Sequence, residues 1–218
     1  MLAPLLLSFQ IALVATSIAA ALGVALGVLL SRRFPGRDVL DVLVTAPVVL
    51  PPTVLGYYVL VLLGRRSALG HAFEALTGSP IVFTRTGAVL AAVIGSLPLT
   101  TKSARAALEG VDRRLVLAAR TLGAGPLRAF WSVHLPLASR GILAGTMLGF
   151  ARSLGDFGVT LMVGGDIPGE TQTAALAIYD AIQAQRDRDA ALLAGFLTLF
   201  GGVVLYVVAK LTGRADGQ

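Results

Sequence analysis

Long apolar runs separated by short charged segments set the pattern of this chain. The first run has no charged residue from Met1 to Ser31, which exceeds the roughly 20 apolar residues that cross a bilayer. Four further apolar runs follow. The pattern therefore predicts an all-α integral membrane protein with five transmembrane helices in a single domain, 1–218. The predicted spans are about 5–30, 42–63, 81–99, 141–163 and 190–209.

Basic residues gather beside alternate ends of these spans. Two arginines at 32–33 follow the first span, and the segment 100–140 holds seven Lys and Arg residues against two acidic ones. Because basic loops stay in the cytoplasm, we place the amino end outside and the carboxyl end, marked by Lys210, inside. The arginines at 65–66 fall on the predicted outer side and oppose this trend.

Composition supports the membrane assignment. The chain is 56% hydrophobic and 14% charged, with a mean hydropathy of +0.81, which excludes both a soluble globule and a disordered chain. A net charge of +6 would suggest nucleic acid in a soluble protein. Here the basic residues lie beside the spans. We therefore predict that the chain has the lipid bilayer as its partner and binds no nucleic acid. Without Cys there is no disulfide and no thiolate metal site.

One segment, 117–136, lies between the third and fourth predicted spans and is too polar to enter a bilayer. Gly123 and the pair Gly125-Pro126 interrupt it, because glycine tolerates left-handed backbone and proline cannot continue a helix. Upstream, apolar residues from 108 to 122 recur three and four apart, which predicts one amphipathic helix. Two interpretations stay open: a helix on the membrane surface, or a helix–Gly–helix knuckle that docks a soluble partner. We call 117–136 the knuckle.

The knuckle resembles the EAA loop of ABC-importer permeases. That motif reads Glu-Ala-Ala, three residues, Gly, nine residues, then Ile-x-Leu-Pro, and the chain matches its spacing from 117 to 136. Val133 replaces Ile, and Leu117 stands where the family has Glu, so the charge of that glutamate is missing while the shape is kept. The resemblance implies coupling to an ATPase through Leu117, Ala118, Ala119, Arg120, Leu122, Gly123, Ala124 and Pro136.

Further blocks resemble molybdate and tungstate permeases in particular. They are the segments 46–66, 84–92, 107–115, 149–158 and 167–171. Sulfate and thiosulfate permeases share the EAA loop, so sulfate or another small oxyanion is the nearest competing cargo.

The resemblance implies a type I ABC-importer membrane domain in the bacterial cytoplasmic (inner) membrane. It implies a homodimer, two cytoplasmic ABC ATPase subunits and an extracytoplasmic oxyanion-binding protein. The chain itself would hold no cofactor, since ATP and Mg would bind to the ATPase.

Five polar or helix-breaking residues inside the predicted spans are candidates for a translocation path. Pro51 and Pro52 free backbone groups that lipid would not tolerate but a protein-lined cavity would. Arg152 and Asp156 lie four residues apart, and Arg152 lies about 18 Å into the membrane at 1.5 Å per residue. Ser153 lies beside them. Two interpretations stay open: an intrahelical ion pair that only neutralises itself, or a pair that lines the path, where Arg152 would attract an anion.

Enzymatic motifs are missing from the sequence. Neither lysine follows a glycine-rich phosphate loop, no serine stands in a G-x-S-x-G frame, and no H-E-x-x-H or paired His/Asp cluster suggests a metal. We therefore predict a non-catalytic membrane subunit. The other class of interpretation is a channel-like membrane protein without an energising partner.

Overall fold

The computed structural model describes residues 2–213, and these residues form helices and connecting loops without a strand. The predicted all-α class is confirmed. Met1 and 214–218, which belong to the predicted domain, lie outside the described residues. The helices are α1 (Leu2–Leu30), α2 (Arg37–Val49), α3 (Pro52–Leu63), α4 (Ala68–Thr77), α5 (Arg85–Glu109), α6 (Arg113–Thr121), α7 (Pro126–Ala129), the π-helical turn η1 (Phe130–His134), α8 (Leu135–Leu154), α9 (Gly158–Val163), α10 (Ala174–Gln183) and α11 (Asp187–Gly213).

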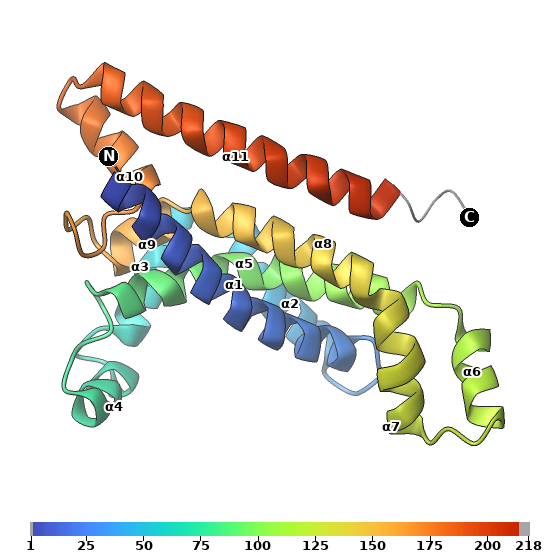
Figure 1. Ribbon diagram of the computed structural model, residues 1–218. Coiled ribbons are helices and arrows are strands. Elements are labelled where there is room, and N and C mark those ends of the chain that lie inside the picture. Colours follow the sequence, from blue (N-terminus) through green and yellow to red (C-terminus); the bar gives the residue numbers. More distant parts are fainter. Residues whose placement is uncertain (1, 214–218) are drawn as a thin grey trace.

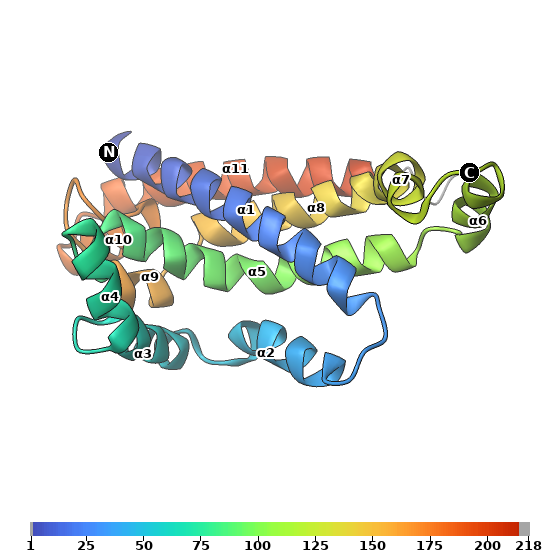
Figure 2. The ribbon, with the colours of Figure 1, turned by 90° about the horizontal axis from the view of Figure 1, so that it is seen from below.

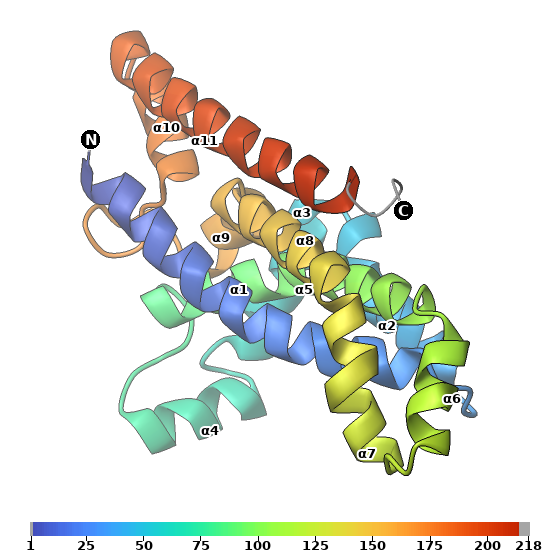
Figure 3. The same cartoon turned by 45° about the vertical axis from the view of Figure 1, so that its right-hand side comes forward.

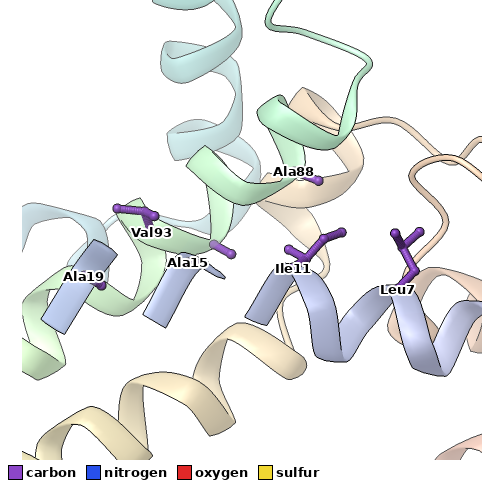
Figure 4. Close-up of a cluster of buried hydrophobic side chains, with 7 residues drawn as sticks. Leu7, Ile11, Ala15, Ala19, Ala88 and Val93 are labelled. Carbon is purple, nitrogen blue, oxygen red and sulfur yellow. The ribbon is translucent and has the colours of Figure 1, made fainter. Parts of the chain in front are cut away.

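Helices α1, α5 and α8 pack side by side and form the centre of the bundle (Figures 1 and 2). Small residues let α1 approach α5 closely: a Cβ added at Gly23 would lie 2.4 Å from Thr100 Oγ1. The Thr100 hydroxyl donates to the carbonyl of Ala19 at 3.0 Å. Close packing of this kind holds membrane helices together, because the hydrophobic effect does not drive helices to associate within lipid. Figure 4 shows the neighbouring cluster of buried side chains, which includes Leu7, Ile11, Ala15, Ala19, Ala88 and Val93.

The carboxyl-terminal helices are attached more loosely to this centre. Helix α11 lies along α8 and contacts α10 (Figure 3). Phe9 of α1 meets Phe200 of α11 edge to face, with ring centroids 4.8 Å apart. Ser8 of α1 accepts a hydrogen bond from the backbone N–H of Ala174 at 2.7 Å, which ties the start of α10 to the same helix.

Two of the predicted spans are interrupted. The segment 42–63 consists of α2 and α3, which meet at 117°, because Pro51 and Pro52 cannot donate the backbone hydrogen bonds that would continue α2. The segment 141–163 consists of the larger part of α8 and the short α9, with a break between them. Helix α5 begins later than the predicted 81 and runs ten residues beyond the predicted 99, to Glu109.

By length and composition, three described helices could cross a membrane: α1, α5 and Asp187–Leu211 of α11. The bent pair α2–α3 would make a fourth. Helix α8, which carries Arg140 and Arg152, is not among them, so this criterion gives fewer than the five spans predicted from the sequence.

Candidate functional site

The knuckle projects from one end of the bundle, beyond α5 and α8 (Figures 1 and 3). Asp112 caps the start of α6 by accepting a hydrogen bond from the N–H of Arg114 at 2.8 Å. After α6 the chain turns at Gly123, whose φ of 89° is left-handed, and the N–H of Ala124 donates to the carbonyl of Ala119 at 3.1 Å. This is the usual way to end a helix with glycine. The helix–Gly–helix shape predicted for the knuckle is therefore present.

The single amphipathic helix predicted up to 122 is wrong. Helix α5 ends at Glu109 and a new helix, α6, begins at Arg113. Gly110 ends the first helix and Asp112 caps the second. Local capping therefore overrides an apolar periodicity that continues across the break.

The surface of the knuckle is exposed. None of the residues of α6 is buried, and Leu122 is 89% exposed. Trp131 of η1 is 62% exposed. Apolar side chains gathered in the open mark an interaction surface. Of the predicted coupling residues, Ala119 and Ala124 are half-buried, while the exposed ones are Leu117, Ala118, Arg120, Leu122, Gly123 and Pro136.

A histidine that was not among the predicted site residues ties the knuckle to α5. Nε2 of His134 lies 2.9 Å from the carbonyl oxygen of Leu108. This carbonyl belongs to the last turn of α5, where it also accepts a hydrogen bond from the N–H of Val111 at 3.3 Å. The ring of His134 also contacts Phe130 with centroids 5.8 Å apart. The returning arm of the knuckle is therefore attached to the end of α5.

The second part of the site is the break between α8 and α9. One carboxylate oxygen of Asp156 accepts from Arg152 Nη1 at 3.0 Å, and the other accepts from the N–H and the hydroxyl of Thr160 at 3.0 and 2.6 Å. Asp156 is 2% exposed, while the Arg152 side chain is 37% exposed. Asp156 is thus fully bonded and satisfies the first turn of α9. Arg152 offers five N–H donors, of which the described residues bond one.

The two helix breaks meet each other. A Cβ added at Gly158, at the start of α9, would lie 2.6 Å from Cβ of Pro52. Gly95 of α5 lies beside the ion pair, because a Cβ there would be in ordinary van der Waals contact with it, 3.8 Å from Asp156 Oδ1 and 3.9 Å from Arg152 Cζ. The structure therefore brings the α3 start, α9 and the ion pair into one region.

The remaining predicted path residues flank this region. Pro51 is exposed in the bend between α2 and α3. Ser153 is buried, and its hydroxyl has no hydrogen-bond partner among the described residues. The sequence did not single out Thr160 or Gly95. Asp156 and Thr160 are four residues apart, one more than the spacing of a helix cap, and nothing local marks Gly95.

A family model described as "Binding-protein-dependent transport system inner membrane component" matches residues 4–215. The chain belongs to this family. The molybdenum transport system permease protein ModB of Escherichia coli K12 is 46% identical over 179 residues, which are 82% of this chain and 78% of ModB. ModB of Azotobacter vinelandii is 37% identical over 95% of this chain and 92% of its own length. The putative molybdenum permease YvgM of Bacillus subtilis is 40% identical over 83% and 80%.

Solved structures of ABC transporters share the fold of this inner membrane component. An inward-facing form of the MetNI methionine transporter gives a TM-score of 0.72 at 16% identity, covering 99% of this chain and 95% of the other. A bacterial alginate transporter, solved with its periplasmic protein, gives 0.75 at 12% identity, covering 100% and 80%. The family and its apolar helices make this chain a multi-pass membrane component of a transport system. Within residues 2–213, no three His, Asp or Glu side chains lie together as a metal site would require.

Proposed function

We propose that the chain is the membrane permease subunit of an ABC importer that moves molybdate, or tungstate, into the cytoplasm. The observation that carries this proposal is the 37–46% identity to the three molybdenum permeases over 82–95% of the chain. The solved transporters, at 12–16% identity, support the fold alone. The cargo is inferred from the sequence relatives. ATP hydrolysis belongs to a partner in this scheme.

We place five crossings in the bacterial cytoplasmic membrane, with the amino end outside and the carboxyl end inside. The crossings are α1, the bent pair α2–α3, α5, α8 with α9, and α11. The basic residues of 100–140 support a cytoplasmic position for the knuckle. Helices α4 and α10 lie at the other end of the bundle (Figure 1), which would face outside.

The proposed assembly is a homodimer with two cytoplasmic ABC ATPase subunits, which bind ATP and Mg, and an extracytoplasmic oxyanion-binding protein. The exposed knuckle is the surface offered to the ATPase. Support for a second copy comes from the unburied apolar face of α2 and α3, where Leu43, Val49 and Tyr58 are 65%, 79% and 58% exposed. Within the membrane this apolar surface can contact a second copy in place of lipid.

In the proposed mechanism, closure of the ATPase dimer displaces the knuckles, and the attached helices tilt between inward-open and outward-open states. The two states must differ by only a few kcal/mol, so that ATP and the loaded binding protein can bias them. Pro51, Pro52 and Ser153 would line the path near the helix breaks. Arg152, held by Asp156, would present its free N–H groups to the passing oxyanion.

Uptake into proteoliposomes tests this function. We expect labelled molybdate to enter vesicles that contain the permease and its ATPase only when ATP is inside the vesicle and the binding protein is outside it. An equal concentration of unlabelled tungstate should compete, whereas sulfate should not. Uptake without ATP would indicate a channel, and equal competition by sulfate would assign the chain to sulfate transport.

Labelling of single cysteines tests the proposed orientation. The chain has no native Cys, so Leu122→Cys in the knuckle and Leu76→Cys in α4 are each the sole thiol. The leucines at these positions are 89% and 87% exposed. A difference in labelling between the two cysteines therefore reports the side of the membrane that each one faces. A membrane-impermeant maleimide should label position 76 in intact cells and position 122 only in inverted vesicles. The reverse result would contradict contact between the knuckle and a cytoplasmic ATPase.

A further inference from the structure

An ionic clamp joins α2 to the last turns of α5. The clamp consists of Arg37, Asp41, Lys102, Arg105 and Glu109. The carboxylate of Asp41 accepts from Lys102 Nζ at 2.5 Å and from Arg105 Nη1 at 3.1 Å. A second contact between the helices has the cation on α2 and the carboxylate on α5: Arg37 lies 3.4 Å from Glu109. Arg105 Nε donates to the same Glu109 oxygen at 2.9 Å.

Asp41 is the central member of the clamp. Its side chain and that of Arg105 are 26% and 22% exposed, against 46% for Glu109. Between the two helices Glu109 makes one contact, to Arg37 at 3.4 Å, whereas Asp41 bonds two cations, at 2.5 and 3.1 Å. The clamp holds three cations and two carboxylates, a net charge of +1. Removal of the Asp41 charge would raise this to +2 and leave cations on both helices facing each other.

Little else holds α2 to the bundle. Val44 is the only buried residue of α2, and the helix packs mainly against α5. Its far end leads directly into the bend at Pro51, next to the proposed path. The position of α2 therefore depends on a few polar contacts at its amino end.

The same turns of α5 also receive the knuckle. His134 binds the carbonyl of Leu108 at 2.9 Å, one residue before Glu109 of the clamp. A displacement of the knuckle therefore reaches the last turn of α5 as well as α8, which continues directly from η1. Asp41 is the group through which that turn holds α2.

We infer that Asp41 is a positioning residue, which makes α2 and the bend at Pro51 follow the end of α5 when the knuckle moves. The inference rests on the proposed importer function. It explains why a carboxylate lies on the helix that, among its residues, buries only Val44. An ion pair at a helix end can transmit a shift, since its partners stay bonded while the helices move together.

The test uses the permease in complex with its ATPase and the binding protein. We expect Asp41→Asn to lower molybdate transported per ATP hydrolysed by about fivefold, within the usual range of coupling between sites, with ATP hydrolysis retained. Spin labels at Val39→Cys and Ala106→Cys, both exposed, should report a longer and broader distance between α2 and α5. Asp38→Asn is the matched control, because Asp38 is an exposed acid on the same helix without a described partner.

The conservative variant separates positioning from a general loss of structure. Asp41→Glu keeps a carboxylate that can bond both Lys102 and Arg105, so it should keep both the distance and the transport ratio close to wild type. An Asp41→Asn complex with the wild-type ratio would overturn the inference, whatever the label distance. If the wild-type complex moves no oxyanion, the proposed function fails, but the label distances still test whether Asp41 holds α2.

Discussion

Replacement of Gly123 by Val should lower ATP-dependent uptake by about tenfold or more, while the permease still inserts and folds. Gly123 has a φ of 89°, where an L-residue costs about 1–2 kcal/mol and a β-branched one costs more. A Cβ at this position would meet nothing within 4 Å, so the effect comes from the backbone alone. The turn would open, and the knuckle would have to return to its docked conformation at a cost in free energy. Each 1.4 kcal/mol of that cost lowers the population of the docked conformation tenfold. Initial uptake per inserted permease measures the effect.

Gly125→Val is the matched control for this change. Gly125 lies two residues further on in the same turn, also with nothing within 4 Å of an added Cβ. Its backbone, at φ −61° and ψ 163°, is extended, which valine adopts readily and which a residue before proline prefers. We expect near wild-type uptake. Equal loss in both variants would mean that bulk matters rather than the left-handed turn, and normal uptake in Gly123→Val would remove the knuckle from the coupling route.

The apolar runs were sufficient to predict an all-helical membrane chain, because helix length and hydropathy are local properties of the sequence. The breaks were harder to place. Pro51 and Pro52 predicted a kink, but the 117° bend depends on what the freed ends contact. Asp156 lies in the break between α8 and α9 and bonds the N–H of Thr160, so a segment that resembled one continuous span consists of two helices. The apolar periodicity across Gly110 misled in the same way.

The candidate site was predictable where it rests on sequence spacing. The turn at Gly123 follows from the residue type, and the Arg152–Asp156 pair follows from a separation of four residues on a helix. Contacts between remote elements have no local signal. The bond from Lys102 to Asp41 spans 61 residues, and the contact of Gly158 with Pro52 depends on how α3 and α9 pack. Polar residues at helix ends indicated that partners exist but not which ones.

Neutral replacement of both members of the Arg152–Asp156 pair should restore stability without restoring transport. Arg152→Met alone leaves the carboxylate of Asp156, 2% exposed, without its cation, which costs roughly 3–5 kcal/mol. With Asp156→Asn added, no charge remains, and the amide oxygen still accepts from Thr160. The unfolding midpoint in detergent should then return close to wild type.

Uptake by the double variant, Arg152→Met with Asp156→Asn, decides between the two interpretations of the pair. If Arg152 meets the oxyanion, loss of a charged hydrogen bond worth about 1.5–3 kcal/mol lowers uptake roughly 10- to 100-fold, although the protein is stable. If the pair only neutralises itself, uptake recovers together with the unfolding midpoint. Arg188→Met controls for the loss of a positive charge, since Arg188 is exposed at the start of α11 and has no ion pair among the described residues. Its uptake and stability should stay at wild-type levels, so a deficit confined to the Arg152 variants would place that guanidinium on the path of the anion.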